Sequence, residues 1–279
     1  MQIRSAGLSF SIGPQKTENT LKKTARELQK IIERISTSTR INSAADDAAG
    51  LSISEELRNR IRGFKSAATN IEDSISAFNI ADNAANSIMD ILQRQRELAI
   101  KAQNATLNDT NRAALDTEYQ SLTQEIARIS SSTQFNRQKV GNGEDLSSGD
   151  AVIQSGPDAT DQIIMPKINF SAQELGIQGT SITTLSNAQS ALSSIDDALK
   201  VVNSQRSTLG AFVNRLESSV NNLSVAMINT QAAESVIRDQ DMAMGLVALT
   251  REQLLHEGSI KAFSRFKSMS TNHILGLLS

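Results

Sequence analysis

Apolar residues recur at helical spacing along most of this chain. In residues 43–104 they follow one another at alternating intervals of four and three, a pattern that predicts a coiled-coil seam. The members of this first seam are Leu57, Ile61, Phe64, Ala68, Ile71, Ile75 and Phe78. Asp82 falls on the same register, so we expect the seam to shift to Ala81 and Ala85 beyond it. A continuous helix of this length would span ~90 Å at about 1.5 Å per residue, which predicts a rod.

A second long helix is predicted over residues 183–240, with the same three-four spacing. This second seam comprises Leu185, Ala188, Leu192, Ile195, Leu199, Val202, Leu209, Val213, Leu216, Val220, Leu223 and Met227. Arg206 is its only charged interruption. Two helices of matched length and matched seams are typical of partners in one bundle. We expect the rod core to include Leu57, Ile61, Phe64, Ile71, Ile75, Leu199, Leu216 and Leu223.

Shorter elements are predicted between the two long helices. A third helix is expected over about 110–130, capped by Asp109 or Thr110 and carrying apolar residues at Leu115, Leu122, Ile126 and Ile129. Two β-like segments, 151–154 and 162–165, flank a stretch rich in Gly, Pro and Asp. That composition favours a turn, so the sequence predicts a β-hairpin near residues 150–166.

Each end of the chain is predicted to form a helical arm. Residues 17–36, entered at Pro14, place Leu21, Ala25, Leu28, Ile32 and Ile35 on one face. The C-terminal arm follows Met242. Short isolated helices are unstable in water, so we expect the arms to be disordered in the monomer and helical among other copies. The predicted division is therefore 1–42 with 243–279 as arms, and 43–242 as the rod.

Two motifs lie where the arms meet the rod. The first is Arg40-Ile41-Asn42-Ser43-Ala44-Ala45-Asp46-Asp47-Ala48-Ala49-Gly50-Leu51. We expect Ser43 to cap the long helix, Asp46 to complete a capping-box arrangement, and Asp46 and Asp47 to lie in its first turn. The second motif is Glu234-Ser235-Val236-Ile237-Arg238-Asp239-Gln240-Asp241-Met242-Ala243.

Together these motifs resemble the signatures of bacterial flagellins. The resemblance covers nearly the whole chain and lacks the large variable middle of many flagellins. It implies a mainly α protein: an elongated coiled-coil-like bundle with a small β-hairpin and terminal helical arms. It implies a subunit that self-assembles into the flagellar filament for motility. The alternatives are a hook–filament junction protein, which shares the terminal architecture, and a secreted helical recognition module.

The resemblance also implies locations and partners. Flagellins are exported through the flagellum's own channel without a cleaved signal peptide, so an extracellular filament is expected. The arms would form the inner tube of that filament, through self-contacts of Leu21, Leu28, Ile32, Leu246, Leu249, Leu254, Phe263, Leu275 and Leu278. Expected partners are further copies of the chain, the flagellar cap, junction proteins and an export chaperone.

Composition narrows the function classes. The chain of 279 residues has no Cys, no Trp and 3% aromatic residues, which suits long helices packed side by side. Its net charge of −2 gives no case for binding nucleic acid. We find no apolar window of transmembrane length and no signal-peptide core, so we expect no membrane insertion. Without the family resemblance, these features would suggest a cytoplasmic protein.

The chain shows no catalytic constellation. His256-Glu257 begins like a zinc-protease motif, but Ile260 stands where the second histidine is required. Asp46 and Asp47 are adjacent and would point apart on a helix, so they cannot act as an acid/base pair. We therefore expect no enzymatic activity, no metal and no cofactor.

One surface of the first long helix has a second interpretation. Residues 91–100 form an amphipathic segment, and that alone explains its composition. The segment is also similar to the flagellin surface contacted by a vertebrate Toll-like receptor. That resemblance implies central roles for Arg94 and Leu98, with Glu118 nearby on the third helix.

Overall fold

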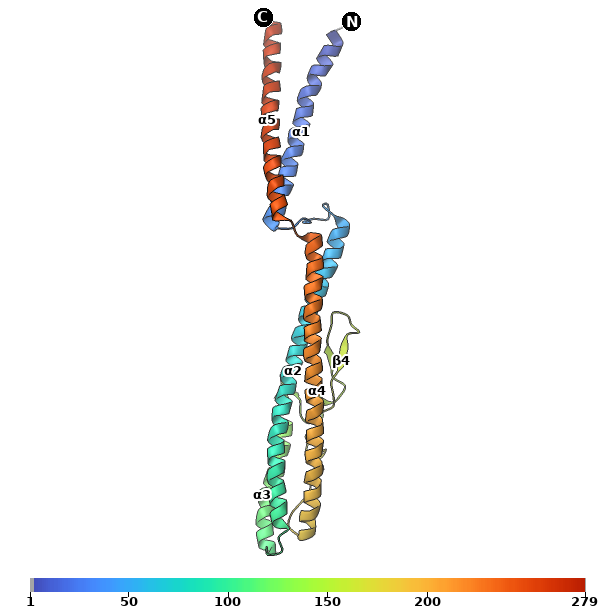
Figure 1. The fold of residues 1–279 in the computed structure, drawn as a ribbon, viewed down its shortest axis with the longest axis vertical. Helices are drawn as coiled ribbons and strands as arrows, with labels where there is room; N and C mark the ends of the chain where they lie inside the picture. Colours follow the sequence, from blue (N-terminus) through green and yellow to red (C-terminus); the bar gives the residue numbers. More distant parts are fainter. Residues whose placement is uncertain (1–2, 279) are drawn as a thin grey trace. The chain divides into compact units, whose positions relative to one another are not determined.

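The computed structural model describes the backbone of residues 3–278 and the side chains of residues 15–269. Five long helices dominate it: α1 (Ile3–Thr37), α2 (Ala48–Ala102), α3 (Asp109–Ser132), α4 (Leu185–Arg238) and α5 (Met242–Leu278) (Figure 1). Contacts divide the chain into two compact units. Unit 1 holds residues 1–58 and 230–279, and unit 2 holds residues 59–229. The predicted fold class, mainly α with small strand pairs, is confirmed.

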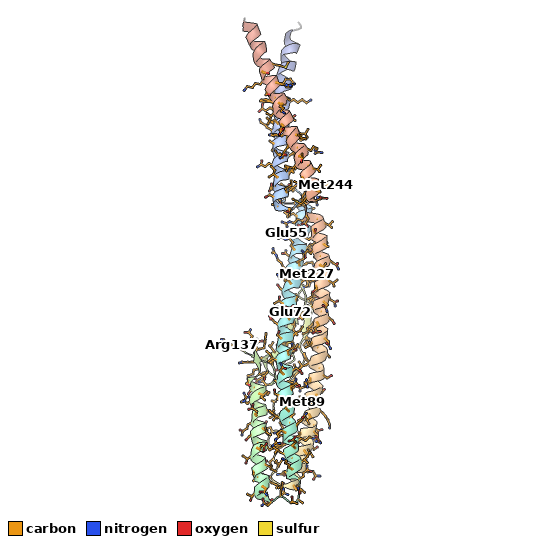
Figure 2. The ribbon with its side chains drawn as sticks, turned by 60° about the vertical axis from the view of Figure 1, so that its left-hand side comes forward. Glu55, Glu72, Met89, Arg137, Met227 and Met244 are labelled. Atoms are coloured by element: carbon orange, nitrogen blue, oxygen red, sulfur yellow. The ribbon has the colours of Figure 1, made fainter. Side chains whose placement is uncertain are left out.

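Unit 2 is an elongated bundle in which α3 and α4 lie beside α2, as two views of the chain agree (Figures 1 and 2). Its core continues along the helices at the predicted spacing, with Ile71, Ile195 and Leu216 fully buried. The predicted shift of the first seam is confirmed, because Ala81 and Ala85 have no exposed surface. Leu223 is also part of this core, and three expected residues pack against it half-buried: Phe64, Ile75 and Leu199. Ile61 is half-buried outside this cluster, and Leu57, also half-buried, lies in unit 1.

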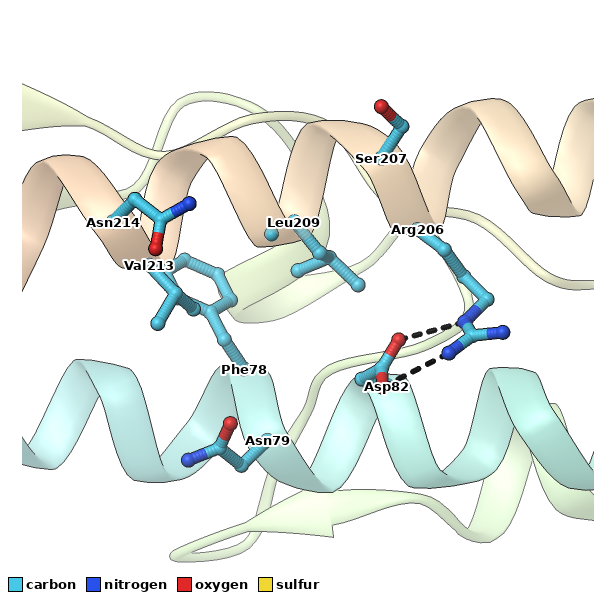
Figure 3. Close-up of a pocket in the computed structure, with 9 residues that line it drawn as sticks. Phe78, Asn79, Asp82, Arg206, Ser207, Leu209, Val213 and Asn214 are labelled. Carbon is cyan, nitrogen blue, oxygen red and sulfur yellow. Dashed lines mark hydrogen bonds and ion pairs between the residues drawn. The ribbon is translucent and has the colours of Figure 1, made fainter.

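The charged interruptions of the two seams meet across the bundle. Arg206 donates from Nε to Asp82 Oδ1 at 2.8 Å and from Nη2 to Asp82 Oδ2 at 3.3 Å (Figure 3). One turn away, Phe78 and Phe212 pack edge to face with ring centroids 5.4 Å apart. The ion pair lets both helices carry a charge on the packed face without leaving either charge unpartnered.

The start of α3 differs from the expectation by one residue. Asn108, rather than Asp109 or Thr110, is the N-cap, and its Oδ1 accepts from the N–H of Asn111 at 2.8 Å. Asn108 has the extended backbone that lets a cap side chain reach back to the third helical residue. Arg112, nearly buried, then donates to the carbonyl of Ala102 and holds the α2–α3 turn closed.

Two small hairpins and a 3-10 helix, η1 (Asp145–Ser147), fill the segment between α3 and α4. The predicted hairpin is confirmed as β3 (Val152–Gln154) paired with β4 (Gln162–Ile164). A second hairpin, β1 (Gln134–Phe135) with β2 (Gln138–Lys139), was not predicted. Its two-residue turn puts both Asn136 and Arg137 at positive φ, and arginine gives no sequence signal for that conformation.

In unit 1, α1 and α5 run side by side in opposite directions and pack on each other (Figure 1). The expected start of the first arm near residue 17 is wrong, because α1 begins at Ile3 and continues through Pro14. A proline removes one backbone donor, which can bend a helix without ending it. The helix ends at Thr37, and the next residue, Ser38, adopts a φ of 58°. In the described part of the chain, no helix is long and apolar enough to cross a membrane.

Candidate functional site

The two sequence motifs are brought together in unit 1. The first connector, residues 38–47, joins α1 to α2, and the second connector, residues 239–241, joins α4 to α5. They meet through an antiparallel bridge between Thr39 and Asp239. The N–H of Gln240 adds a hydrogen bond of 3.1 Å to a carbonyl of the first connector. Segments two hundred residues apart in the chain therefore form one junction.

Arg40 closes the C-terminal end of α4. Its backbone N–H donates to the carbonyl of Arg238 at 2.6 Å, and its Nη2 donates to the carbonyl of Ile237 at 2.7 Å. The last carbonyls of a helix lack intrahelical partners and carry partial negative charge, so a cationic donor there is stabilising. The first motif thus supplies the cap for the helix that carries the second motif.

Asp46 shapes the first connector instead of capping a helix. Its Oδ2 accepts from the N–H groups of Asn42 and Ser43 at 3.3 and 3.1 Å and from the Ser43 hydroxyl at 3.1 Å. The backbone hydrogen bond from Ser43 is the main cause that lowers the pKa of Asp46, and the positive charge of Arg34 acts in the same direction. The prediction that Ser43 caps the long helix is therefore wrong, because α2 begins five residues later at Ala48.

Two other aspartates cap the helices that leave the junction. Asp47 accepts from the N–H of Gly50 at 2.9 Å, so it stands directly before α2 and not in its first turn as predicted. Asp241 accepts from the N–H groups of Ala243 and Met244 at 2.9 and 3.1 Å, at the start of α5. Each carboxylate satisfies free N–H groups and complements the positive helix end. The connectors end two helices and begin two new ones.

Gly50 is required by close packing inside the junction. A Cβ there would lie 2.5 Å from Asp47 Oδ2 and 2.8 Å from Ile41 Cδ1. Ile41 is almost fully buried, at 1% exposure, so it has little room to give way. The absence of a side chain at Gly50 therefore leaves room for side chains of its own connector.

An ion pair ties α2 to α4 beside the connectors. Arg238 Nη1 lies 2.7 Å from Glu55 Oε1, which also accepts from Arg58 at 3.0 Å. The hydrogen bond from Arg238 is the main cause that lowers the pKa of Glu55. Arg238 thus contributes its carbonyl to Arg40 and its guanidinium to Glu55, so it takes part in both halves of the junction.

The arm helices bury polar groups between them. Thr24 is 7% exposed, and its hydroxyl lies 3.2 Å from His256 Nδ1. Glu252, one turn before His256 on α5, is also 7% exposed. In the described side chains no group of three or more His, Cys, Asp or Glu residues is placed to hold a metal ion.

The residues of the arms that were expected to make self-contacts differ in their exposure. Leu21, Leu28, Leu249 and Phe263 are half-buried. Ile32, Leu246 and Leu254 are 51%, 52% and 66% exposed. Ile31 is half-buried where Ile32 was expected on the packed face, because the face that α5 covers is rotated slightly from the predicted one. Leu275 and Leu278 lie outside the residues whose side chains are described.

The expected receptor surface contains one exposed pair and one buried residue. Arg94 bonds Glu118 through Nη2 at 2.8 Å and Glu97 through Nη1 at 2.9 Å. These hydrogen bonds, that of Glu118 first, raise the pKa of Arg94. Leu98 is fully buried, so a direct contact between Leu98 and a receptor is incompatible with this fold. It belongs to the hydrophobic core of unit 2.

Comparisons with known proteins find matches to both the N-terminal and the C-terminal parts of the chain. A family model for the bacterial flagellin N-terminal helical region matches residues 11–145, and one for the C-terminal helical region matches residues 192–278. The chain is 43% identical over 233 residues to a flagellin of Halalkalibacterium halodurans, covering 83% of this chain and 85% of that protein. It is 34% identical over 262 residues to the flagellar filament 31.3 kDa core protein of Treponema maltophilum, covering 89% and 91% of the two chains.

A solved structure is also similar. The crystal structure of Bacillus cereus flagellin aligns with a TM-score of 0.49 at 31% identity, covering 56% of this chain and 88% of that one. The N-terminal family model includes the first connector, and the C-terminal family model includes the second connector.

Proposed function

This chain belongs to the bacterial flagellin family, and from that premise we propose that its arms, residues 1–42 and 243–279, form the inner tube of a filament whose outer tube is built from residues 43–242. The chain is a structural subunit that self-assembles into the extracellular flagellar filament used for motility. Its family is structural and is not known for catalysis. A junction-protein role is not favoured, because the relatives are filament proteins.

The observation that carries the proposal is the apolar surface of α5. Besides Leu246 and Leu254, Met244 and Val247 are each 69% exposed, so apolar side chains surround the helix on more than the side that α1 covers. A helix that is apolar on several sides is stable in water only when other chains bury it. Copies of the same chain supply those neighbours in a homopolymer.

We propose that the junction lets one continuous chain contribute to both tubes. Asp47 and Asp241 start new helices while Arg40 ends α4, so each long helix is separated from the arm that follows or precedes it. The capped connectors then fix where arm helices end, which every copy in a regular filament must share.

Export and partner binding are proposed from family membership. The chain would leave the cell through the flagellar channel without a cleaved signal peptide, and it would meet an export chaperone, junction proteins and the filament cap. A Toll-like receptor would contact the exposed Arg94–Glu118 pair on monomer only. The competing function is a secreted recognition module that stays monomeric.

Deletion of residues 261–279 tests the role of the C-terminal arm. The truncated chain should remain helical but fail to pellet as filaments when concentrated with a precipitating salt. Each large apolar side chain removed would have contributed ~1.5–3 kcal/mol on full burial. Regular filaments from the truncated chain would contradict the inner-tube assignment. Loss of its circular dichroism signal would instead show that this segment belongs to the rod.

A pair of point variants separates apolar contact from charge. Leu254→Glu and Gln253→Glu place the same charge on adjacent exposed positions of α5. Leu254→Glu should suppress polymerisation more strongly, because only that variant removes an apolar contact. Equal effects would show that the apolar face of α5 is not what drives assembly, and monomeric full-length chain would favour the recognition module.

A further inference from the structure

The outward face of α1 carries a row of cations, which we call the basic stripe: Lys16, Lys23, Arg26 and Lys30. Spacings of seven, three and four place these four residues on one side of the helix, away from the side that packs on α5. All four are exposed, and no carboxylate among the described residues forms an ion pair with any of them. Few carboxylates are near these cations in the sequence, because residues 15–40 hold seven basic and only three acidic side chains.

A stretch of opposite charge lies on α2 in unit 2. Residues 66–93, which we call the acidic stretch, contain four carboxylates and no Lys, Arg or His. Asp82 is bonded by Arg206, but Glu72, Asp73 and Asp90 are exposed and have no ion pair among the described residues (Figure 2 labels Glu72). Glu72 and Asp90 are eighteen residues apart, about five helical turns, so both project from one side of α2.

We propose that the basic stripe of one copy docks on the acidic stretch of a second copy during assembly. This inference rests on the self-assembly of the chain and assigns two of the surfaces that carry it. The two surfaces have comparable lengths, ~21 Å from Lys16 to Lys30 and ~27 Å from Glu72 to Asp90 at about 1.5 Å per residue. The basic stripe holds four cations with one exposed carboxylate, Glu27, among them, and the acidic stretch holds three unpaired carboxylates. The net charges of the two surfaces are therefore opposite, which makes them complementary.

A second copy fits this stripe better than a lipid surface does. A helix that binds an anionic membrane inserts its apolar face between the headgroups. Most large apolar side chains among the described residues of α1 are half-buried, and Ile32, at 51% exposure, is the exception, so little apolar surface accompanies the stripe. Every further copy also carries an acidic stretch, so a homopolymer supplies the opposite charge at high local concentration. Anionic lipid is therefore an outcome of the test and not the proposed partner.

The contact selects one arrangement of copies over others. Exposed ion pairs are individually weak, so the pairs that three free carboxylates allow add modest affinity. Two basic stripes repel each other, as do two acidic stretches, so copies that meet through identical faces are disfavoured. Unlike faces in contact give a heterologous interface, the type that propagates into an open helical filament.

Charge reversal and its compensation provide the test. Lys23→Glu with Lys30→Glu reverses the stripe, and Glu72→Lys with Asp90→Lys reverses the stretch. Each double variant should need at least about tenfold more protein to elongate filament seeds at low ionic strength, because attraction becomes repulsion at several positions. The fourfold variant should recover most of the loss, since both faces are then reversed together. Lys200→Glu is the matched control, because Lys200 is exposed but pairs with Asp197 on its own helix.

Three results would overturn the proposal. The first is elongation of both double variants at the wild-type rate. The second is a fourfold variant no better than the worse double variant while all variants keep the wild-type helix signal. The third is loss of binding to vesicles with anionic headgroups in the stripe variant alone, without loss of elongation. Failure of the wild-type chain to polymerise at all would instead contradict the self-assembly on which the inference rests. At about 1 M NaCl, where the screening length is about 3 Å, the difference between variants should shrink.

Discussion

Replacing Asp82 with leucine should destabilise unit 2, although leucine continues the apolar seam of α2. Arg206 would lose both hydrogen bonds, of 2.8 and 3.3 Å, while its side chain stays only 29% exposed. Removing one partner of a fully buried ion pair costs about 3–5 kcal/mol, and an exposed pair contributes about 0–1 kcal/mol. The partial exposure of this pair places the expected loss at about 1–2 kcal/mol.

The double variant Asp82→Leu with Arg206→Leu should recover this loss. It leaves no unpaired charge and lets apolar side chains meet where the two seams were interrupted. Apolar replacement of a buried ion pair is often neutral or stabilising by about 1–4 kcal/mol, and partial exposure puts this case at the low end. The second substitution should therefore stabilise the Asp82→Leu background, whereas Arg206→Leu alone should destabilise the wild type.

Urea unfolding of the monomer, followed by circular dichroism, measures the free energy of unfolding of the wild type, the two single variants and the double variant. Additivity would refute this reasoning: the double variant would then lose as much stability as the two single variants lose together. That outcome would mean that Asp82 and Arg206 do not interact in solution. Phe212→Leu is a useful control, because it alters the packing on Phe78, one turn from Asp82, without removing a charge.

Three further predictions concern the core, the arms and the junction. Ile71→Asp should lower monomer stability by about 3 kcal/mol or more, since it buries an unpaired charge, and an unchanged melting curve would contradict the seam. Backbone amides of both arms should exchange with solvent quickly in the monomer while those of the rod seams are protected, and equal protection would show that the arms fold before assembly. The pKa values of Asp46 and Glu55 lie below their usual 3.8 and 4.5, so the stability that these carboxylates give the junction is complete above those usual values and is lost as pH falls through the lowered ones. A titration of unfolding free energy should show a smaller acid-dependent loss in Asp46→Asn with Glu55→Gln than in the wild type.

The sequence alone determined the helices and the faces by which the rod packs. Burial of one helix face requires apolar residues three and four positions apart, and that requirement is local. It sufficed for the two long helices, for the seam shift to Ala81 and Ala85, and for the turn chemistry of β3–β4. The motifs identified the family and placed the connectors between arms and rod.

Local rules were less reliable at helix ends and tight turns. Several residues near a helix start can serve as the cap, and only the path of the backbone selects one. That is why Asp47 replaced Ser43 before α2 and Asn108 replaced its neighbours before α3. Arg137 in the β1–β2 turn adopts a positive φ, which its residue type does not predict.

Only the tertiary structure decided which distant residues meet. A seam specifies the side of a helix but not how far that helix slides along its partner, because similar apolar residues repeat every turn. The pairing of Asp82 with Arg206 and the capping of α4 by Arg40 both depend on that axial register. The sum of all contacts along the two helices sets this register, so no local pattern could have supplied these pairs.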